Sequence, residues 1–184
     1  MFEIKFKIIE NTAELGKLSA YEFDRSYDRI DGLFRIRTDD LEEGYYSEAP
    51  LCAEEVGDEM IDYWLRNLLE AAVILSRESG YASFKEIETP NIWVGFTGMG
   101  NDIAISILSD NDKEGTFCRE PHGRTLTSSI CSRYDLIKET TDAANEFIAL
   151  LKEINPELLK TNLAKRITAP LKQLERAEIL IHGE

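Results

Sequence analysis

The sequence predicts an α+β fold, in which antiparallel sheets pack against a long central helix and C-terminal helices. Period-two alternation of apolar and polar residues recurs in the first 40 positions, and helical periodicity appears near residue 55 and again from about residue 133. Short β-rich runs bounded by turns fill the stretch between these helices. Because short turns separate most strands, antiparallel pairing is favoured over βαβ winding.

The N-terminal unit is predicted to contain three strands. Phe2, Ile4, Phe6 and Ile8 alternate with charged residues, which is typical of a half-buried strand. After a cap-like turn we expect a second strand over 18–23, and the turn signal Asp31-Gly32 precedes a third over 33–37.

A long central helix is predicted from about residue 55 to residue 79. One helical face carries Met60, Trp64, Leu68 and Leu75, and the second half is apolar nearly all round. We therefore expect this helix to be buried, with Trp64 in the core and Gly80 as its C-terminal stop.

The middle of the chain reads as a second β region. Strands are expected over 83–88, 92–97 and 103–108, with edge strands over 116–119 and 125–131. Gly98-Met99-Gly100 lacks both the Lys-Ser/Thr of a P-loop and the following helix of a dinucleotide fold, so we interpret it as a hairpin turn.

Helical periodicity returns in the last third of the chain. An amphipathic stripe runs from about Arg133 to Ile154, Asn155-Pro156 starts another helix, and Thr168-Ala169-Pro170 is expected to start a last one. We predict one domain over 1–184, with parts at 1–80, 81–131 and 133–182.

Composition indicates the setting of the protein. Three cysteines without paired spacing (Cys52, Cys118, Cys131) point to a reducing compartment, and neither a secretory leader nor an apolar span is visible. We expect a cytoplasmic protein without a membrane partner. The net charge of −14 argues against binding to nucleic acid, because that binding needs clustered cations.

A block of ten carboxylates without a Lys or Arg lies between Thr38 and Leu65, and such a block attracts basic partners. The acids at the helix start follow from the helix dipole, whereas the absence of any compensating base across the whole stretch is harder to explain in that way. Tyr45 and Tyr46 lie beside it, and tyrosine is enriched at interfaces. The predicted partner-binding residues are Asp39, Asp40, Glu42, Glu43, Tyr45, Tyr46 and Glu48.

Motifs for metals and catalysis are incomplete. Residues 110–117 resemble the first eight positions of an EF-hand loop, but Pro121 stands where a bidentate Glu is required. Cys118, His122 and Cys131 are the only cluster of soft ligands, fewer than structural zinc requires. No orienting partner for a catalytic His122 is evident nearby in the sequence. We therefore expect no cofactor, no metal and no catalytic residue.

A resemblance adds a functional expectation. The run from Tyr27 to Phe34, then Gly44-Tyr45-Tyr46, then the acidic helix around Trp64 resembles small acidic bacterial proteins, some of which are similar to immunity proteins of polymorphic toxin systems. The resemblance covers about the first 80 residues. It implies a cytoplasmic inhibitor that binds a toxin domain through an acidic surface.

Three functions remain open on the sequence. The first is a non-enzymatic acidic binding protein, an immunity-type inhibitor of a basic toxin or nuclease domain. The second is a small hydrolase or ligand-binding enzyme that uses carboxylates and His122. The third is a subunit of a structural homo-oligomer, in which a basic tail meets an acidic head.

Overall fold

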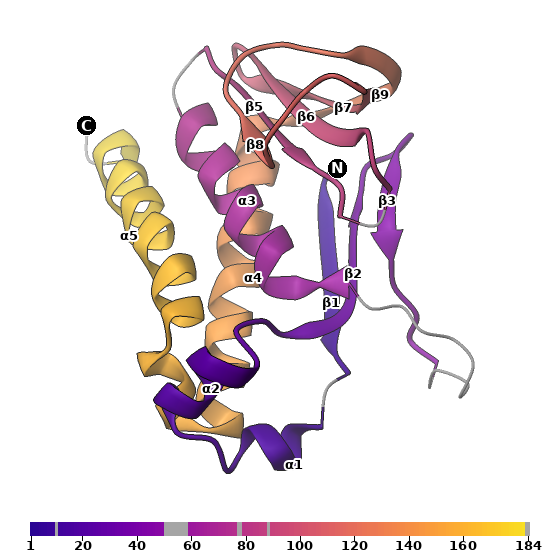
Figure 1. The fold of residues 1–184 in the computed structure, drawn as a ribbon. Helices are drawn as coiled ribbons and strands as arrows, with labels where there is room; N and C mark the ends of the chain where they lie inside the picture. Colours follow the sequence, from indigo (N-terminus) through magenta and orange to yellow (C-terminus); the bar gives the residue numbers. More distant parts are fainter. Residues whose placement is uncertain (10, 50–58, 77–78, 88, 183–184) are drawn as a thin grey trace.

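The computed structural model of the chain (Figure 1) describes residues 1–9, 11–49, 59–76, 79–87 and 89–182, with side chains described as far as residue 175. It confirms the α+β class, because two antiparallel sheets pack against a group of helices. Figure 1 shows α3 and α4 lying between the sheets and α5.

Sheet A belongs to the N-terminal part of the chain. Its strands are β1 (Glu3–Ile8), β2 (Asp31–Arg37), β3 (Glu42–Tyr45) and β4 (Glu59–Met60). β2 is central, since β1, β3 and β4 all pair with it in antiparallel register. Phe34 and Ile36 face the core, so Arg35 and Arg37 alternate onto the outer face.

Sheet B is formed by the middle of the chain, in the order β8-β5-β6-β7-β9. Its strands are β5 (Tyr81–Lys85), β6 (Ile92–Met99), β7 (Asp102–Ser109), β8 (Phe117–Cys118) and β9 (Arg124–Ser132). The two predicted edge strands do lie at the two edges. β6 and β7 form a hairpin whose turn contains Gly100, at a positive φ of 67° that glycine tolerates without strain.

The helices are α1 (Thr12–Leu15), α2 (Ala20–Ser26), α3 (Ile61–Leu75), α4 (Arg133–Ile154), the 3₁₀ helix η1 (Pro156–Lys160) and α5 (Asn162–His182). α3 is the central buried helix that the sequence predicts, and α4 packs against it. Among the described residues, no helix combines the length and the apolar character that a membrane span requires.

Two predictions in the N-terminal half are wrong. The strand expected over 18–23 is replaced by α2, because Ser19 and Glu22 form a capping box that satisfies the first N–H groups of that helix. No strand is predicted within the acidic block, yet β3 lies there, since backbone pairing with β2 outweighs the low strand propensity of its two glutamates.

The predicted helix boundaries also need correction. α3 begins at Ile61 because Glu59 and Met60 pair with β2, and it ends at Leu75, five residues before Gly80. Residues 55–58 lie outside the described part of the chain. The last helix does not start at Pro170, since α5 runs through this proline from Asn162.

One hydrophobic cluster contains residues from both sheets and from the helices, and Trp64 lies within it as predicted. The indole ring of Trp64 stacks on Phe34 of sheet A at 5.2 Å and meets Phe84 of sheet B edge-on at 5.3 Å. A smaller cluster of Tyr81, Trp93, Leu108 and Cys118 lies apart from it. On β5, Ala82 and Phe84 point to the main cluster, so Tyr81 and Ser83 point to the opposite face of sheet B.

Candidate functional site

The predicted partner-binding residues lie along the β2–β3 hairpin and the segment after it. Asp39 and Asp40 are exposed in its turn, Glu42 is exposed on β3, and Glu48 is exposed beyond the strand. Tyr45 is 44% exposed, whereas Tyr46 is half-buried. β3 is the edge strand next to β2 in sheet A (Figure 1), so these residues follow one margin of that sheet.

Cations from neighbouring strands meet this acidic run. The N-terminal ammonium lies 3.3 Å from Asp39, Lys5 lies 3.4 Å from Glu48, and Arg35 lies 3.6 Å from Glu42. The sheet thus supplies positive charge that the linear sequence lacks between Thr38 and Leu65. The field of the block is weaker than its sequence suggests.

Tyr46 also contacts these cations. The Nζ atom of Lys5 lies 5.6 Å from the centre of its ring, and the guanidinium carbon of Arg35 lies 5.7 Å from it. Both distances suit cation–π attraction. Tyr46 is therefore held against sheet A, and Tyr45 is the tyrosine of the pair that projects into solvent.

Other carboxylates of the block point inward. Glu59 accepts a hydrogen bond from the indole N–H of Trp64 at 2.7 Å, and Asp62 accepts one from the backbone N–H of Ile30 at 3.0 Å. Burial raises the pKa of Glu43, and the nearby charge of Glu86 raises it further. Glu59 and Asp62 thus serve the fold, while Glu54, Glu55 and Asp58 lie outside the described residues.

His122 has an orienting partner, contrary to the expectation from the sequence. Asp110 Oδ2 lies 2.8 Å from His122 Nδ1, and Ser83 Oγ lies 2.8 Å from His122 Nε2. A carboxylate at Nδ1 holds the proton on that nitrogen, so in the neutral ring Nε2 accepts from the Ser83 hydroxyl. We call this chain of hydrogen bonds the His122 relay. Trp93 packs edge-on against the imidazole at 4.6 Å.

Asp110 is fixed from two sides. Its Oδ1 accepts the backbone N–H groups of Asp112 and Lys113, each at 3.0 Å, while Oδ2 serves His122. These bonds favour the ionised form, and the bond with His122 contributes most to holding the pKa of Asp110 below its ordinary value. The residues that resemble an EF-hand loop therefore form a turn that aims Asp110 at the imidazole.

The His122 relay has the order of a hydrolase triad but not the accessibility of one. A pocket of about 350 Å³ opens beside the imidazole, between Tyr81, Gly95, Leu108 and Gly123. Ser83, however, is 0% exposed in the middle of β5, between β8 and β6. Nucleophilic catalysis requires that substrate reach the hydroxyl. In this geometry the relay has a structural role. It holds Asp110, which follows β7, and His122, which precedes β9, against Ser83 of β5.

The soft-ligand cluster is not assembled. Cys131 is buried in the main cluster, where burial raises the pKa of its thiol to about 12, whereas Cys118 belongs to the smaller cluster. Cys118 donates to the carbonyl of Glu120 at 3.3 Å. In the part of the chain that the structure describes, no three His, Cys, Asp or Glu residues are placed to hold a metal ion.

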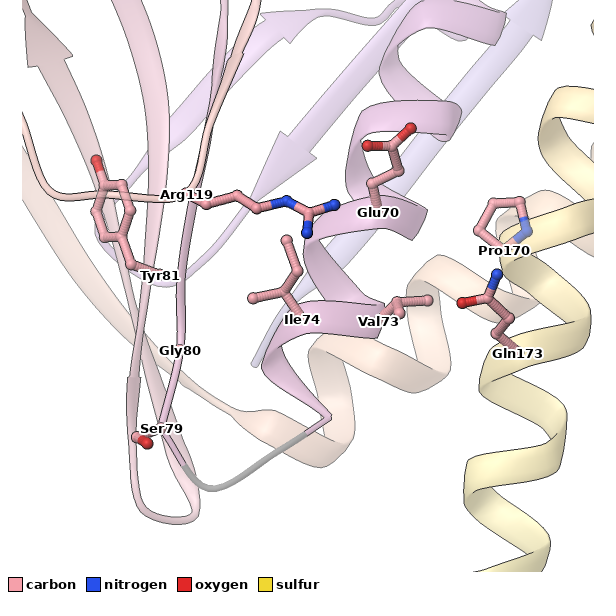
Figure 2. Close-up of a pocket in the computed structure, with 9 residues that line it drawn as sticks. All are labelled: Glu70, Val73, Ile74, Ser79, Gly80, Tyr81, Arg119, Pro170 and Gln173. Carbon is pink, nitrogen blue, oxygen red and sulfur yellow. The ribbon is translucent and has the colours of Figure 1, made fainter.

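A groove that the sequence did not predict lies between α3, α5 and sheet B (Figure 2). Its main hollow has a volume of about 600 Å³ and is bordered by Glu70, Ile74, Tyr81, Arg119 and Gln173, among others. A second hollow of about 440 Å³ shares Glu70 and Pro170 with the first, so the two adjoin each other.

The groove is assembled from residues far apart in the sequence. Its helical walls are stripes at i, i+4 and i+7: Arg66, Glu70 and Val73 on α3, and Arg166, Pro170 and Gln173 on α5. Either stripe alone reads as an ordinary mixed helix surface. Only the packing of α5 on α3 brings them face to face.

No protein-family model matches this chain, and neither a curated protein nor a solved structure shows significant similarity to it.

Proposed function

We propose that this chain is a non-enzymatic binding protein of the immunity-inhibitor type, which docks a basic protein partner through an acidic patch of Asp39, Asp40, Glu42, Tyr45 and Glu48. The supporting observation is that these five residues are exposed on the β2–β3 hairpin and the segment after it, where β3 is the edge strand of the described part of sheet A. Figure 1 places β3 on the side of the molecule away from the helices.

The ion pairs already present in the patch do not prevent docking. The carboxylates of Asp39, Glu42 and Glu48 keep 72%, 53% and 80% of their side-chain surface exposed. Exposed pairs of this kind contribute only about 0–1 kcal/mol, so the cations of a partner can replace the intramolecular ones. Tyr45 then supplies the apolar contact area that charged rims lack.

Charge reversal tests this proposal. The partner is first captured from a lysate of the native host and purified, and its association is then measured by stopped flow at low salt. Asp39, Asp40, Glu42 and Glu48 are replaced together by Lys. Association should slow by about tenfold or more, because steering depends on the local field. Tyr45→Ala should mainly speed dissociation.

A matched control carries the same charge change elsewhere. Asp112, Glu114, Glu146 and Glu153 are exposed acids outside the acidic patch. Their joint replacement by Lys should leave most of the association rate intact. If the control slows association as much as the patch variant does, overall charge and not the patch governs binding. If the patch variant associates as fast as the parent, the proposed docking surface is wrong.

A hydrolase is the second candidate, favoured by the two 2.8 Å distances of the His122 relay. A fluorophosphonate reagent that labels activated serines separates the two functions. We expect no label on Ser83, because its hydroxyl is buried. Labelling of Ser83 in the parent and its loss in His122→Gln would establish the hydrolase instead.

A further inference from the structure

The groove between α3 and α5 contains three arginines that form no ion pair with the described residues, although the charges of Arg66 and Arg166 also act on the buried carboxylate of Asp62. Arg66 lies on α3, Arg119 follows β8 and Arg166 lies on α5. The chain has 35 acidic residues against 21 basic ones, yet none of the three forms an ion pair with any described residue. The lining of the two hollows thus carries three arginines against one carboxylate, Glu70, so positive charge exceeds negative charge there.

Neutral groups orient two of these arginines. The guanidinium of Arg66 lies 5.4 Å from the centre of the Tyr63 ring, and Arg166 donates to the carbonyl of Asp28 at 3.4 Å. Each guanidinium has five N–H donors, so most of them remain available. These contacts fix position without neutralising charge.

Within the groove, Glu70 separates Arg119 of the main hollow from the two arginines of the second hollow. Figure 2 shows Arg119 reaching from the sheet side toward Glu70 on α3, with Pro170 and Gln173 on the opposite wall. Arg66 and Arg166 border the second hollow, on the other side of the residues that the two hollows share. A single compact anion in the middle would meet the carboxylate of Glu70. Two separate anionic groups, one in each hollow, would avoid it.

We propose that this groove binds a small polar molecule that carries two oxyanionic groups, either phosphates or carboxylates. Guanidinium forks match both groups, and the hollows have the size of small-molecule sites. Ser79 and Gln173 add polar side chains to the lining of the main hollow. Because the whole protein repels anions, affinity here depends on these short-range contacts and not on long-range steering.

Titration calorimetry with defined probes tests the site. Fructose 1,6-bisphosphate represents the phosphate source, succinate the carboxylate source, and inorganic phosphate the single compact anion. We expect saturable binding of the bisphosphate or of succinate, and at least about tenfold weaker binding of inorganic phosphate. The tighter of the first two probes identifies the chemical source.

Arginine variants locate the site. Arg66→Gln, Arg119→Gln and Arg166→Gln should each weaken binding by about tenfold, the usual effect of losing a charged hydrogen bond. Arg124→Gln is the control, because Arg124 is exposed on β9 and lines neither hollow. Thermal melts establish that each variant is folded, and Arg119 is exposed enough to be replaced without loss of packing.

Two outcomes would overturn the proposal. One is the absence of saturable binding by both two-headed probes at millimolar concentration. The other is binding that Arg124→Gln weakens as much as the three groove variants do, which would indicate diffuse attraction to any surface cation.

Discussion

At the scale of single residues, Asp110 and Asp62 differ in what stabilises their charge. Asp110 accepts two backbone N–H groups and bonds His122, and its pKa lies below the ordinary value. Asp62 accepts the backbone N–H of Ile30, but burial raises its pKa despite this bond and the positive charges of Arg166 and Arg66. The two acids therefore respond to pH in opposite directions.

Asp110 should make stability depend on acid. Since its pKa is lower in the folded than in the unfolded chain, its stabilising contribution is present above about pH 4 and is lost as pH falls through the lowered folded value. We expect the difference in melting temperature between the parent and Asp110→Asn to shrink steadily below about pH 4. A difference that stays constant down to pH 2, about two units below the unfolded pKa, would contradict this.

Asp62 should behave in the reverse way. Its raised pKa means that ionisation opposes folding at neutral pH, and stability rises as pH falls through the folded value. Asp62→Asn keeps an acceptor for the Ile30 N–H and removes the charge, so unfolding in urea at pH 7 should show equal or greater stability. Asp62→Ala should lose about 1–3 kcal/mol, because that buried N–H is left without its partner. Equal losses in both variants would refute the argument.

At the scale of elements, the sequence identified the strands that alternate and missed those defined by pairing. β1, β2, β6 and β7 carry apolar residues at every second position, and their predicted bounds lie within a few residues of the observed ones. β3 is a strand because β2 lies beside it, which no local pattern shows. The capping box of Ser19 and Glu22 is a local signal in the sequence that favours α2 over the strand expected at 18–23.

The His122 relay and the groove were beyond prediction for a related reason. Ser83 and Asp110 lie 39 and 12 positions from His122, and they meet because the strands of sheet B bring their loops together. The spacing of residues in a sequence reveals functional groups that lie on one helix or in one loop. It does not reveal groups of residues that only the tertiary fold brings together.

Pro170 offers a test at the same scale. A proline inside a helix removes one backbone hydrogen bond and crowds the preceding turn. Pro170→Ala should therefore raise the free energy of unfolding by about 1–3 kcal/mol, seen as a melting temperature higher by several degrees.

Pro156 supplies the matched control for this substitution. It stands in the first turn of η1, where proline suits the backbone. Pro156→Ala should thus give no gain in stability. A gain at Pro156 as large as that at Pro170 would show that helix position is not the cause.

At the scale of the whole molecule, the sheet order redistributes charge that the sequence segregates. The carboxylates of the β2–β3 hairpin and the segment after it form ion pairs with the N-terminus, Lys5 of β1 and Arg35 of β2. Meanwhile three cations that are scattered over 100 positions gather in one groove. A run of like-charged residues in a sequence is therefore only an approximate guide to the charge of the folded surface.

The whole fold should depend on neither metal nor disulfide. Cys118 and Cys131 are free and buried in different clusters, and a continuous apolar cluster already joins both sheets to the helices. Circular dichroism should show mixed α and β structure, and the melting temperature should be unchanged by EDTA or by a reducing agent. A fall of several degrees, which corresponds to at least about 1 kcal/mol for a chain of this size, would reveal a ligand or a cross-link.

The two tryptophans lie in different hydrophobic clusters, so their fluorescence emission reports on two different parts of the protein. Trp64 is packed between Phe34 and Phe84 in the main cluster, so its emission follows global unfolding. Trp93 lies in the smaller cluster under His122, so its emission shifts to the red when water enters there, even if the rest of the chain stays folded. A Trp64→Phe protein therefore emits from Trp93 alone. Unlabelled fluorescence would then distinguish local opening of the outer face of sheet B from loss of the entire fold.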